Sequence, residues 1–361
     1  MKTEDFPTTD RRTVSFEDGE LVLIDQTKIP ESFELIKTKD IDRIAQAIVS
    51  MEVRGAPAIG ATAGYAMALA AEQSSSSSPE GLLNDLNEAK EKLAATRPTA
   101  TNLFWALDRM MNFAEEHISS DLERLPALML EEAHRIADED IEINTAISRF
   151  GSDVIFDGAS IHTHCNCGAT ACVGVGTAVG AMVYAHTQGK HIHVYTDETR
   201  PRLQGAKINV WELEEAGVPY TLIPDNHAAY LMKRGEIDMV FIGADRVVAN
   251  GDTAAKIGVY GACLAANHHD IPVYVFTPKS TIDMSIPSGD AIEIEERDPD
   301  EVRKVNGSLI TLPEANVLNY AFDVTPHEMI TALITEEGII YPPFDEGLQE
   351  IFSTTTTGGR I

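Results

Sequence analysis

The chain has 361 residues, 43% of them hydrophobic, and a formal net charge of −29 at pH 7. This length predicts about two domains at roughly 150 residues each. The hydrophobic content is sufficient for packed cores, which excludes a disordered acidic tail or a coiled coil. The negative charge argues against a protein that binds nucleic acid or an anionic membrane, because it repels phosphate groups.

The acidic composition has two physical interpretations. An acidic surface stays hydrated in concentrated salt, where screening weakens its self-repulsion, and the scarcity of lysine relative to arginine favours such a salt adaptation. The alternative is ordinary acidic solubility, and the composition leaves both interpretations open.

The sequence carries no pattern of export or membrane insertion. The first residues contain no apolar signal core, and no run of about 18 apolar residues occurs. The four cysteines are Cys165, Cys167, Cys172 and Cys263, and three of them fall within eight residues, unlike a disulfide framework. We therefore expect a cytoplasmic protein.

The N-terminal part, residues 1–148, is predicted to be a β-hairpin followed by a helical domain. Apolar residues alternate through residues 13–30 around a turn at residues 17–19. From residue 40 onward apolar residues recur at helical spacing. The serine run at residues 74–78, followed by Pro79, predicts a solvated loop between two helices.

The C-terminal part, residues 149–361, shows a different pattern. Short apolar runs at residues 194–195, 220–223, 239–242 and 273–276 alternate with helix-like stretches. This alternation predicts a Rossmann-like, doubly wound and mostly parallel sheet, and hence an α/β protein. Ligands of such sheets bind at the carboxyl ends of the strands.

Polar loops follow three of the predicted strands. They span residues 164–168, 197–205 and 244–252. Because the carboxyl ends of parallel strands lie along one edge, we expect these loops to converge on an active site.

The first loop contains Cys165, a candidate nucleophile or acid–base group. We expect a helix over residues 169–180, whose N-terminus would lower the pKa of the thiol and bind anions. The alternative is a cysteine that serves only as a small buried hydrophobic residue. A metal site of His162, His164, Cys165 and Cys167 is disfavoured, because side chains alternate between the two faces of a strand.

Asp245 follows an apolar strand and precedes Arg246, with which it could form an ion pair. A carboxylate at this position is either a structural cap or a catalytic acid with a raised pKa, and the sequence favours neither.

Two arginines of the helical part are candidate phosphate ligands. Arg54 begins a small-residue stretch at residues 54–60, and Arg97 precedes another helix. No Walker A loop is present, and residues 174–176 fall inside the helix expected at 169–180, so they form no dinucleotide fingerprint. We therefore expect no nucleotide cofactor.

Five separate motifs resemble those of the methylthioribose-1-phosphate isomerases, in the same order and across nearly the whole chain. They are residues 54–60, 163–168, 197–205, 243–246 with 250–252, and 322–326. The superfamily also contains ribose-1,5-bisphosphate isomerases and regulatory subunits of the translation-initiation guanine-nucleotide exchange factor. Residues 280–290 and 295–299 look more like the methylthioribose branch than the others.

The resemblance implies an aldose–ketose isomerase of methionine salvage that acts on a small sugar phosphate. It also implies a homodimer that needs neither a metal nor a coenzyme. By matching motif positions, the catalytic pair is Cys165 and Asp245. The substrate-binding positions are Arg54, Gly55, Ala56, Arg97, Gln204, Ala255 and Lys256.

The chain departs from the family pattern at several positions. Ala255 stands where the family usually has asparagine, Cys167 where it has alanine, Lys207 where it has arginine and Val259 where it has threonine. The first departure removes a substrate amide contact, which keeps a ribose-1,5-bisphosphate isomerase as an alternative. A non-catalytic translation-initiation subunit is a second alternative, although such a protein could dispense with Cys165 and Asp245.

Overall fold

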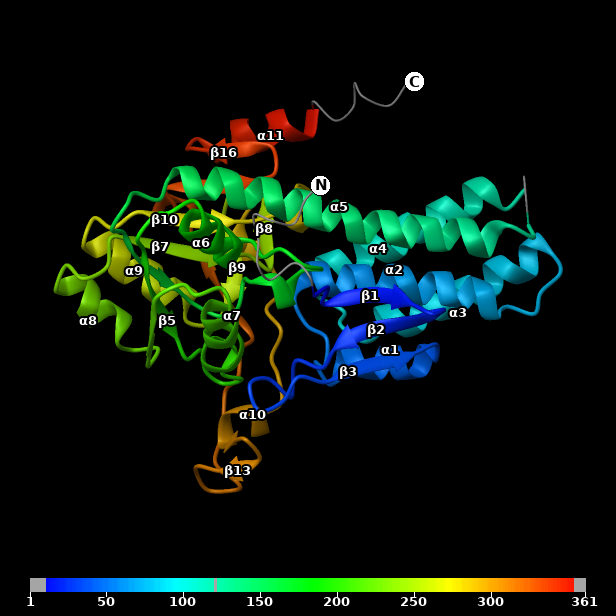
Figure 1. The fold of residues 1–361 in the computed structure, drawn as a ribbon, viewed down its shortest axis with the longest axis horizontal. Coiled ribbons are helices and arrows are strands. Elements are labelled where there is room, and N and C mark those ends of the chain that lie inside the picture. Colours follow the sequence, from blue (N-terminus) through cyan, green and yellow to red (C-terminus); the bar gives the residue numbers. More distant parts are fainter. Residues whose placement is uncertain (1–10, 120–121, 354–361) are drawn as a thin grey trace. The chain divides into compact units, whose positions relative to one another are not determined.

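The computed structural model describes residues 11–119 and 122–353 (Figure 1). By its internal contacts the chain divides into two compact units. The first, called the N-terminal unit, contains the described residues 11–144 together with Ala169–Gly176. The second, called the sheet unit, contains Thr145–Gly168 and the chain from Thr177 onward. Among the described residues, no helix is both long and apolar enough to cross a membrane.

The N-terminal unit begins with an antiparallel sheet of β1 (Val14–Glu17), β2 (Glu20–Ile24) and β3 (Leu35–Thr38). The predicted hairpin is confirmed. Its turn residues Asp18 and Gly19 both have positive φ, 52° and 79°, which matches the twist of a two-residue hairpin loop. The sequence analysis missed β3, because this short strand is largely exposed and lacks an apolar pattern.

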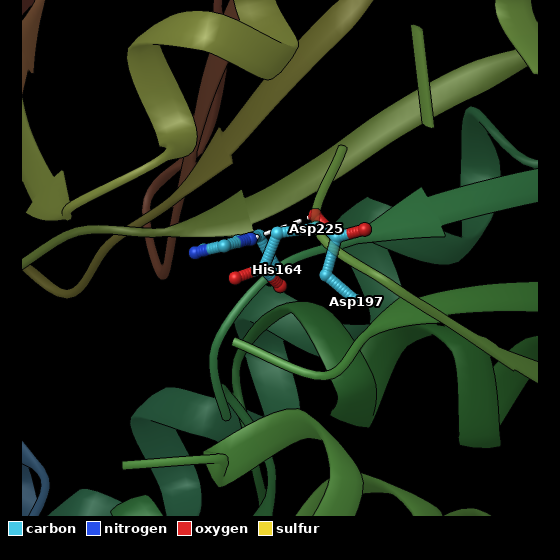
Figure 2. Close-up of side chains that lie close together, drawn as sticks. All are labelled: His164, Asp197 and Asp225. Atoms are coloured by element: carbon cyan, nitrogen blue, oxygen red, sulfur yellow. Dashed lines mark hydrogen bonds and ion pairs between the residues drawn. The ribbon is translucent and has the colours of Figure 1, made fainter. Parts of the chain in front are cut away.

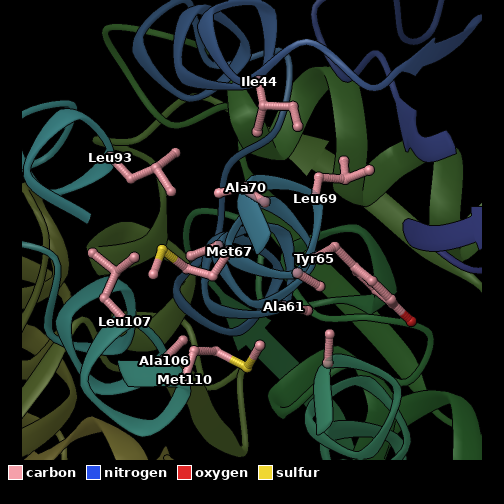
Figure 3. Close-up of a cluster of buried hydrophobic side chains, with 14 of the residues drawn as sticks. Ile44, Ala61, Tyr65, Met67, Leu69, Ala70, Leu93, Ala106, Leu107 and Met110 are labelled. Carbon is pink, nitrogen blue, oxygen red and sulfur yellow. The ribbon is translucent and has the colours of Figure 1, made fainter. Parts of the chain in front are cut away.

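The rest of this unit is helical, as the sequence predicted. Its described residues form α1 (Ile41–Val49), α2 (Ala56–Gln73), α3 (Pro79–Ala94), α4 (Thr101–His117) and α5 (Leu125–Asp153), and α5 continues into the sheet unit. Every residue of α2 from Ala58 to Ala71 is buried, so this apolar helix forms the centre of the core shown in Figure 3. The serine run connects α2 to α3, and Ser78 caps α3 by accepting a hydrogen bond from Gly81 N.

The sheet unit is built on seven strands in the order β16-β15-β10-β7-β4-β5-β6. All neighbours are parallel except β15 and β16, which confirms the predicted Rossmann-like α/β sheet. From β4 the chain proceeds outward through β5 and β6, then returns to place β7 on the other side of β4. The topological switch point therefore lies between β4 and β7.

The strands of this sheet are β4 (Ser160–Thr163), β5 (His193–Asp197), β6 (Tyr220–Ile223), β7 (Met239–Gly243), β10 (Val273–Phe276), β15 (Ala332–Thr335) and β16 (Gly338–Ile340). The longer helices of the unit are α6 (Ala178–Thr187), α7 (Val210–Glu215), α8 (Ala228–Lys233), α9 (Val259–His268) and α11 (Phe344–Ser353). Buried aliphatic side chains of β7, β10 and β15 form the core beneath α8, α9 and α11.

A second, four-stranded sheet follows β7 and contains β11 (Ile282–Asp283), β8 (Arg246–Val248), β9 (Thr253–Lys256) and β14 (Phe322–Thr325). Between β11 and β14 the chain forms α10 (Asp300–Arg303) and the small hairpin of β12 (Lys304–Val305) and β13 (Ser308–Leu309). Figure 1 shows α10 and this hairpin, in orange, extending away from the two sheets of their unit.

The prediction of a helix over residues 169–180 is wrong. A single 3₁₀ turn, η2 (Ala169–Ala171), is followed by irregular backbone, and α6 begins only at Ala178. The backbone of Val173 is engaged elsewhere: its N–H donates to Asp140 Oδ2 at 2.7 Å, and its carbonyl accepts from Thr13 N at 2.7 Å. These bonds replace helical ones, so the expected helix N-terminus directly after Gly168 does not exist.

Candidate active site

Two of the predicted polar loops, residues 164–168 and 197–205, meet at the carboxyl edge of the seven-stranded sheet, as expected. The third, residues 244–252, is not wholly a loop, because it contains the strand β8 of the second sheet. Gly243 N, at the end of β7, donates to Cys167 Sγ at 3.1 Å, which joins residues 164–168, called the cysteine loop, to the end of β7 across the switch point. Cys165 N donates to Thr199 Oγ1 at 2.9 Å, which joins the cysteine loop to the loop after β5. Backbone and side-chain hydrogen bonds thus fix the loops to one another.

Cys165 differs from the other three cysteines in exposure. It is partly exposed, whereas Cys167, Cys172 and Cys263 are buried. Its backbone has a φ of 66°, in the left-handed region that non-glycine residues rarely adopt. Residues held in this way occur often at functional sites, where the surrounding structure maintains the unusual conformation.

Gly168 closes the cysteine loop, and any larger residue there would require the Glu212 side chain to move. A Cβ atom there would lie 1.5 Å from Glu212 Oε2, and Glu212 is itself buried in α7. The acidic side chain of α7 therefore packs directly against the end of the cysteine loop.

Two buried charged residues, His164 of the cysteine loop and Asp197 at the end of β5, lie close to the half-buried Asp225 (Figure 2). His164 Nδ1 lies 2.7 Å from Asp197 Oδ2, and His164 Nε2 lies 3.0 Å from the carbonyl oxygen of Ile257. Burial alone lowers the pKa of His164, but the hydrogen bond and the charge of Asp197 outweigh it, so the pKa is raised. With an acceptor at each ring nitrogen, His164 is held as an imidazolium that donates two hydrogen bonds.

Asp197 also lies close to a second histidine. His162 Nε2 is 3.0 Å from Asp197 Oδ2, because His162 and His164 are two residues apart and project from the same face of the chain. Burial raises the pKa of Asp197, but the two histidines oppose it and the net pKa is lowered. The carboxylate is therefore ionised and shared between both rings.

His164, Asp197 and Asp225 each offer a ligand atom, and these atoms lie within 4.8 Å of one another. Most of these ligand atoms already have partners within the protein, whereas Asp197 Oδ1 has no hydrogen-bond partner among the described residues. Both nitrogens of His164 have acceptors, and the Asp225 oxygens accept hydrogen bonds from Thr199 N at 2.6 Å and Arg200 N at 2.7 Å. The cluster therefore has the hydrogen-bonding pattern of a structural network. Cys165 and Cys167, weighed as metal ligands from the sequence, are not part of it.

Asp245 lies where the chain leaves β7 for the second sheet. Its N–H donates to the carbonyl oxygen of Ala254 at 2.9 Å, and the residue is partly exposed. The neighbouring Arg246 has its Nη1 3.7 Å from Asp283 Oδ2. Asp245 is the second residue after the end of β7. It therefore lies at the same edge of the seven-stranded sheet as the cysteine loop.

Ala255 and Lys256 are adjacent on β9, the strand that pairs with β8 and β14. Both are buried. Lys256 Nζ donates to the carbonyl oxygen of Ala321 at 2.7 Å and lies 4.7 Å from the centroid of the Phe322 ring. The ammonium group is thus held in place from the side of β14.

Gln204 lies at the start of the π-helical turn η3 (Gly205–Asn209) and is 6% exposed. Within the described part of the chain, its Oε1 has no hydrogen-bond partner. A buried amide oxygen without a partner carries a desolvation penalty unless a ligand or water satisfies it.

The remaining candidate residues lie in the N-terminal unit. Gly55, with a φ of 101°, immediately precedes α2, and a Cβ atom there would lie 2.3 Å from the backbone of Ala171. Gln26 Nε2 donates to the carbonyl oxygens of Arg54 and Thr170, at 3.2 and 2.8 Å, and so fixes this close approach. Ala56 is the first residue of α2. Arg97 belongs to the turn before α4, where Ala100 N donates to its carbonyl oxygen at 3.1 Å.

Comparison with known proteins assigns the family. Residues 52–342 match the model of the Initiation factor 2 subunit family. The methylthioribose-1-phosphate isomerase of Desulforamulus reducens is 48% identical over 338 residues, which cover 94% of this chain and 98% of the relative. The chain belongs to the methylthioribose-1-phosphate isomerases.

Solved structures agree with this assignment to the methylthioribose-1-phosphate isomerases. The 5-methylthioribose 1-phosphate isomerase of Pyrococcus horikoshii matches with a TM-score of 0.90 and 42% identity, covering 98% of this chain and 99% of the other. A structure described as the translation initiation factor eIF-2B, subunit delta, from A. fulgidus matches with a TM-score of 0.83 and 40% identity, covering 95% and 99%. The family assignment makes this chain an isomerase and favours this function over the two alternatives.

Sequence reasoning missed several residues at the carboxyl edge of this isomerase. From the sequence, His164 is weighed only as a disfavoured metal ligand, and Asp197 is included only as part of a motif. Thr199, Glu212 and Asp225 are not singled out. His164 directly precedes Cys165, which was the one available signal. Asp225 follows β6 outside the predicted loops, so only the fold brings it to the site.

Proposed function

We propose that this chain converts S-methyl-5-thioribose 1-phosphate to S-methyl-5-thioribulose 1-phosphate in methionine salvage. The observation that carries the proposal is a partly exposed cysteine and a partly exposed aspartate at the two sides of the switch point, in a member of this family. Since an ionised phosphate does not cross a membrane unaided, we place the reaction in the cytoplasm.

The chemistry of the substrate requires two groups of the enzyme, an acid and a group that acts at C2, on opposite sides of the sugar. The phosphate on the anomeric oxygen prevents spontaneous opening of the sugar ring, so the enzyme must protonate the ring oxygen while the bond from that oxygen to C1 breaks. Hydrogen must then move from C2 to C1 while the C2 hydroxyl releases its proton, which replaces the one given to the ring oxygen and leaves a carbonyl at C2. We assign the acid to Asp245, which follows β7, and the group facing C2 to Cys165, which follows β4.

Two routes are compatible with Cys165 at this position. In the enediol route the thiolate removes the C2 proton and the proton returns at C1. In the hydride route hydrogen passes directly from C2 to C1, and the thiol stabilises the transition state. Deuterium placed at C2 distinguishes them, because exchange into solvent supports the first route and full retention at C1 supports the second.

The remaining candidate residues would bind the substrate. The unpartnered amide oxygen of Gln204 and the fixed ammonium group of Lys256 support binding in the sheet unit. In the N-terminal unit, Arg54, Arg97 and the start of α2 at Gly55 and Ala56 would bind the phosphate, since arginines and helix N-termini both favour oxyanions.

Ala255 bears on the choice between sugar phosphates. It is buried and cannot supply the amide contact that the family's usual asparagine would make. A ribose-1,5-bisphosphate pocket needs cations near the substrate's C5 end, whereas a methylthio group needs an apolar surface. We propose that the methylthio sugar is preferred and that the enzyme acts as a homodimer without a nucleic-acid partner.

A direct assay tests the proposal. Purified protein is incubated with methylthioribose 1-phosphate and, in parallel, with ribose 1,5-bisphosphate, and ketose formation is followed by a coupled reaction. We expect turnover of the methylthio substrate with a higher kcat/KM. Turnover of neither sugar, together with co-purification in a translation-initiation complex, would establish the regulatory function instead.

A further inference from the structure

The segment at residues 295–303, part of which resembles the methylthioribose branch, has no role in the chemistry described above. Its centre is Glu301 on α10, whose side chain is 15% exposed. Glu301 Oε1 accepts hydrogen bonds from Arg202 Nη1 at 2.9 Å and from Arg297 Nη2 at 3.0 Å. Glu301 Oε2 accepts a third from Asn319 Nδ2 at 3.3 Å.

These contacts attach α10 to the loop after β5. Arg202 belongs to that loop, and so does Arg200, whose Nη2 donates to the carbonyl oxygen of Val302 at 2.9 Å. Burial raises the pKa of Glu301, but Arg297, Arg202 and Asn319 oppose it and the net pKa is lowered. Glu301 is therefore an ionised carboxylate that accepts bonds from both sides of the junction.

The opposite side of the same loop is attached to the cysteine loop. Thr199 N donates to Asp225 at 2.6 Å, and Thr199 Oγ1 accepts from Cys165 N at 2.9 Å. Thr199 and Leu203 have φ values of 64° and 63°, which non-glycine residues adopt at a cost of about 1 kcal/mol or more each. Such a loop keeps its conformation only when its surroundings hold it from several sides.

We propose that Glu301 is a positioning residue for the isomerase site. It fixes Arg202, and with it the loop that presents Gln204 and that holds the backbone of Cys165 through Thr199. Glu301 itself does not contact the substrate. This inference rests on the proposed function, because Gln204 and Cys165 have their roles only in that reaction.

The variant Glu301→Gln tests the proposal, since glutamine preserves the size of the side chain but removes its charge. We expect KM for methylthioribose 1-phosphate to rise about tenfold or more, with a smaller change in kcat. The double variant Glu301→Gln with Arg202→Gln should lose little beyond the single variant, because the two side chains act through one ion pair. Asp300→Asn is the matched control: Asp300 is also on α10 but pairs with Arg303 and Lys304, so KM should stay unchanged.

Alkylation of Cys165 by iodoacetamide gives a second readout that needs no turnover. We expect substrate to protect Cys165 at a higher concentration in Glu301→Gln than in the wild type, with the melting temperature within a few degrees. If the wild type turns over the substrate and Glu301→Gln has the same KM and protection, the inference is wrong while the proposed function stands. If the wild type has no turnover and the substrate does not protect Cys165, the proposed function itself is wrong.

Discussion

Asp197 at the end of β5 and His164, the first residue of the cysteine loop, form a buried ion pair with 2.7 Å between Asp197 Oδ2 and His164 Nδ1. The same carboxylate oxygen lies 3.0 Å from His162 Nε2. The pair connects the ends of β4 and β5, and the second nitrogen of His164 extends the connection to Ile257, next to Lys256. Removing one member of such a buried pair strongly destabilises the protein, because the other charge is then buried without a partner.

The pair predicts a defined pH dependence of stability. The pKa of His164 is raised above its ordinary 6.5, so its contribution is complete below about pH 6.5 and is lost as the pH rises through the folded-state value. The pKa of Asp197 is lowered from 3.8, so its contribution is present above about pH 4 and is lost on acidification. Stability from the pair is therefore greatest between about pH 4 and 6.5.

Asp197→Asn tests this dependence. We expect the variant to be destabilised by roughly 3–5 kcal/mol, because His164 loses its counter-charge in a buried site. Thermal unfolding between pH 5.5 and 8.5 should show the wild type losing stability as the pH rises, and the variant losing less. Parallel curves for the two proteins would contradict a raised pKa at His164.

The proposed catalytic pair predicts loss of activity without loss of structure. Cys165→Ser and Asp245→Asn should each lower kcat by roughly 10²- to 10⁴-fold, the usual contribution of a positioned acid or base. Cys263→Ala is the matched cysteine control, since Cys263 is buried in α9, in the core that α8, α9 and α11 form with the sheet. It should retain its kcat. Full activity in Cys165→Ser or Asp245→Asn would remove that residue from the mechanism.

The turn at Gly55 predicts a large steric effect. Gly55→Ala would place a methyl group 2.3 Å from the Ala171 backbone and force a side chain into a φ of 101°. We expect destabilisation by more than about 2 kcal/mol. Gly158→Ala is the control, because Gly158 has a φ of 90° but open space around its Cβ position. It should cost only about 1–2 kcal/mol, and equal melting temperatures for the two variants would disprove the close contact.

Asp140 predicts a second pH effect, in the N-terminal unit. Burial raises the pKa of Asp140 to about 7, although Val173 N and Asn144 donate hydrogen bonds to it. Because the folded-state pKa lies above the ordinary 3.8, the wild type loses stability as the pH rises from about 4 through 7. Asp140→Asn keeps an acceptor for Val173 without a charge. We expect its melting temperature to exceed that of the wild type by a few degrees at pH 8 but not at pH 5.

The net charge of −29 predicts a response to salt. The screening length falls from about 10 Å at 0.1 M to about 3 Å at 1 M, which weakens repulsion among the acidic side chains. If the acidity is a salt adaptation, specific activity and melting temperature should both rise from dilute buffer to molar KCl. Highest activity in dilute buffer would show that the charge serves ordinary solubility.

Local patterns in the sequence were sufficient to predict the N-terminal hairpin and the parallel strands. Asp18 and Gly19 specify a hairpin turn because they tolerate positive φ. Short apolar runs that alternate with helix-like stretches specify the parallel strands, and hence the edge of the sheet where ligands bind. Residues 169–180 show where such signals fail. The small residues there are compatible with a helix, but Asp140 and Thr13, distant in sequence, take the hydrogen bonds of Val173.

The sequence by itself determined the α/β class, the family and the candidate residues Cys165 and Asp245, because motifs and periodicity are properties of neighbouring residues. Only the tertiary structure decided which charged side chains form pairs. Asp197 lies 33 positions from His164 in the chain, and Glu301 lies 99 positions from Arg202. These pairs exist because parallel strands bring their carboxyl ends to one edge and because α10 returns to the loop after β5. Buried carboxylates and cations then pair, since leaving either one alone in the protein interior is unfavourable.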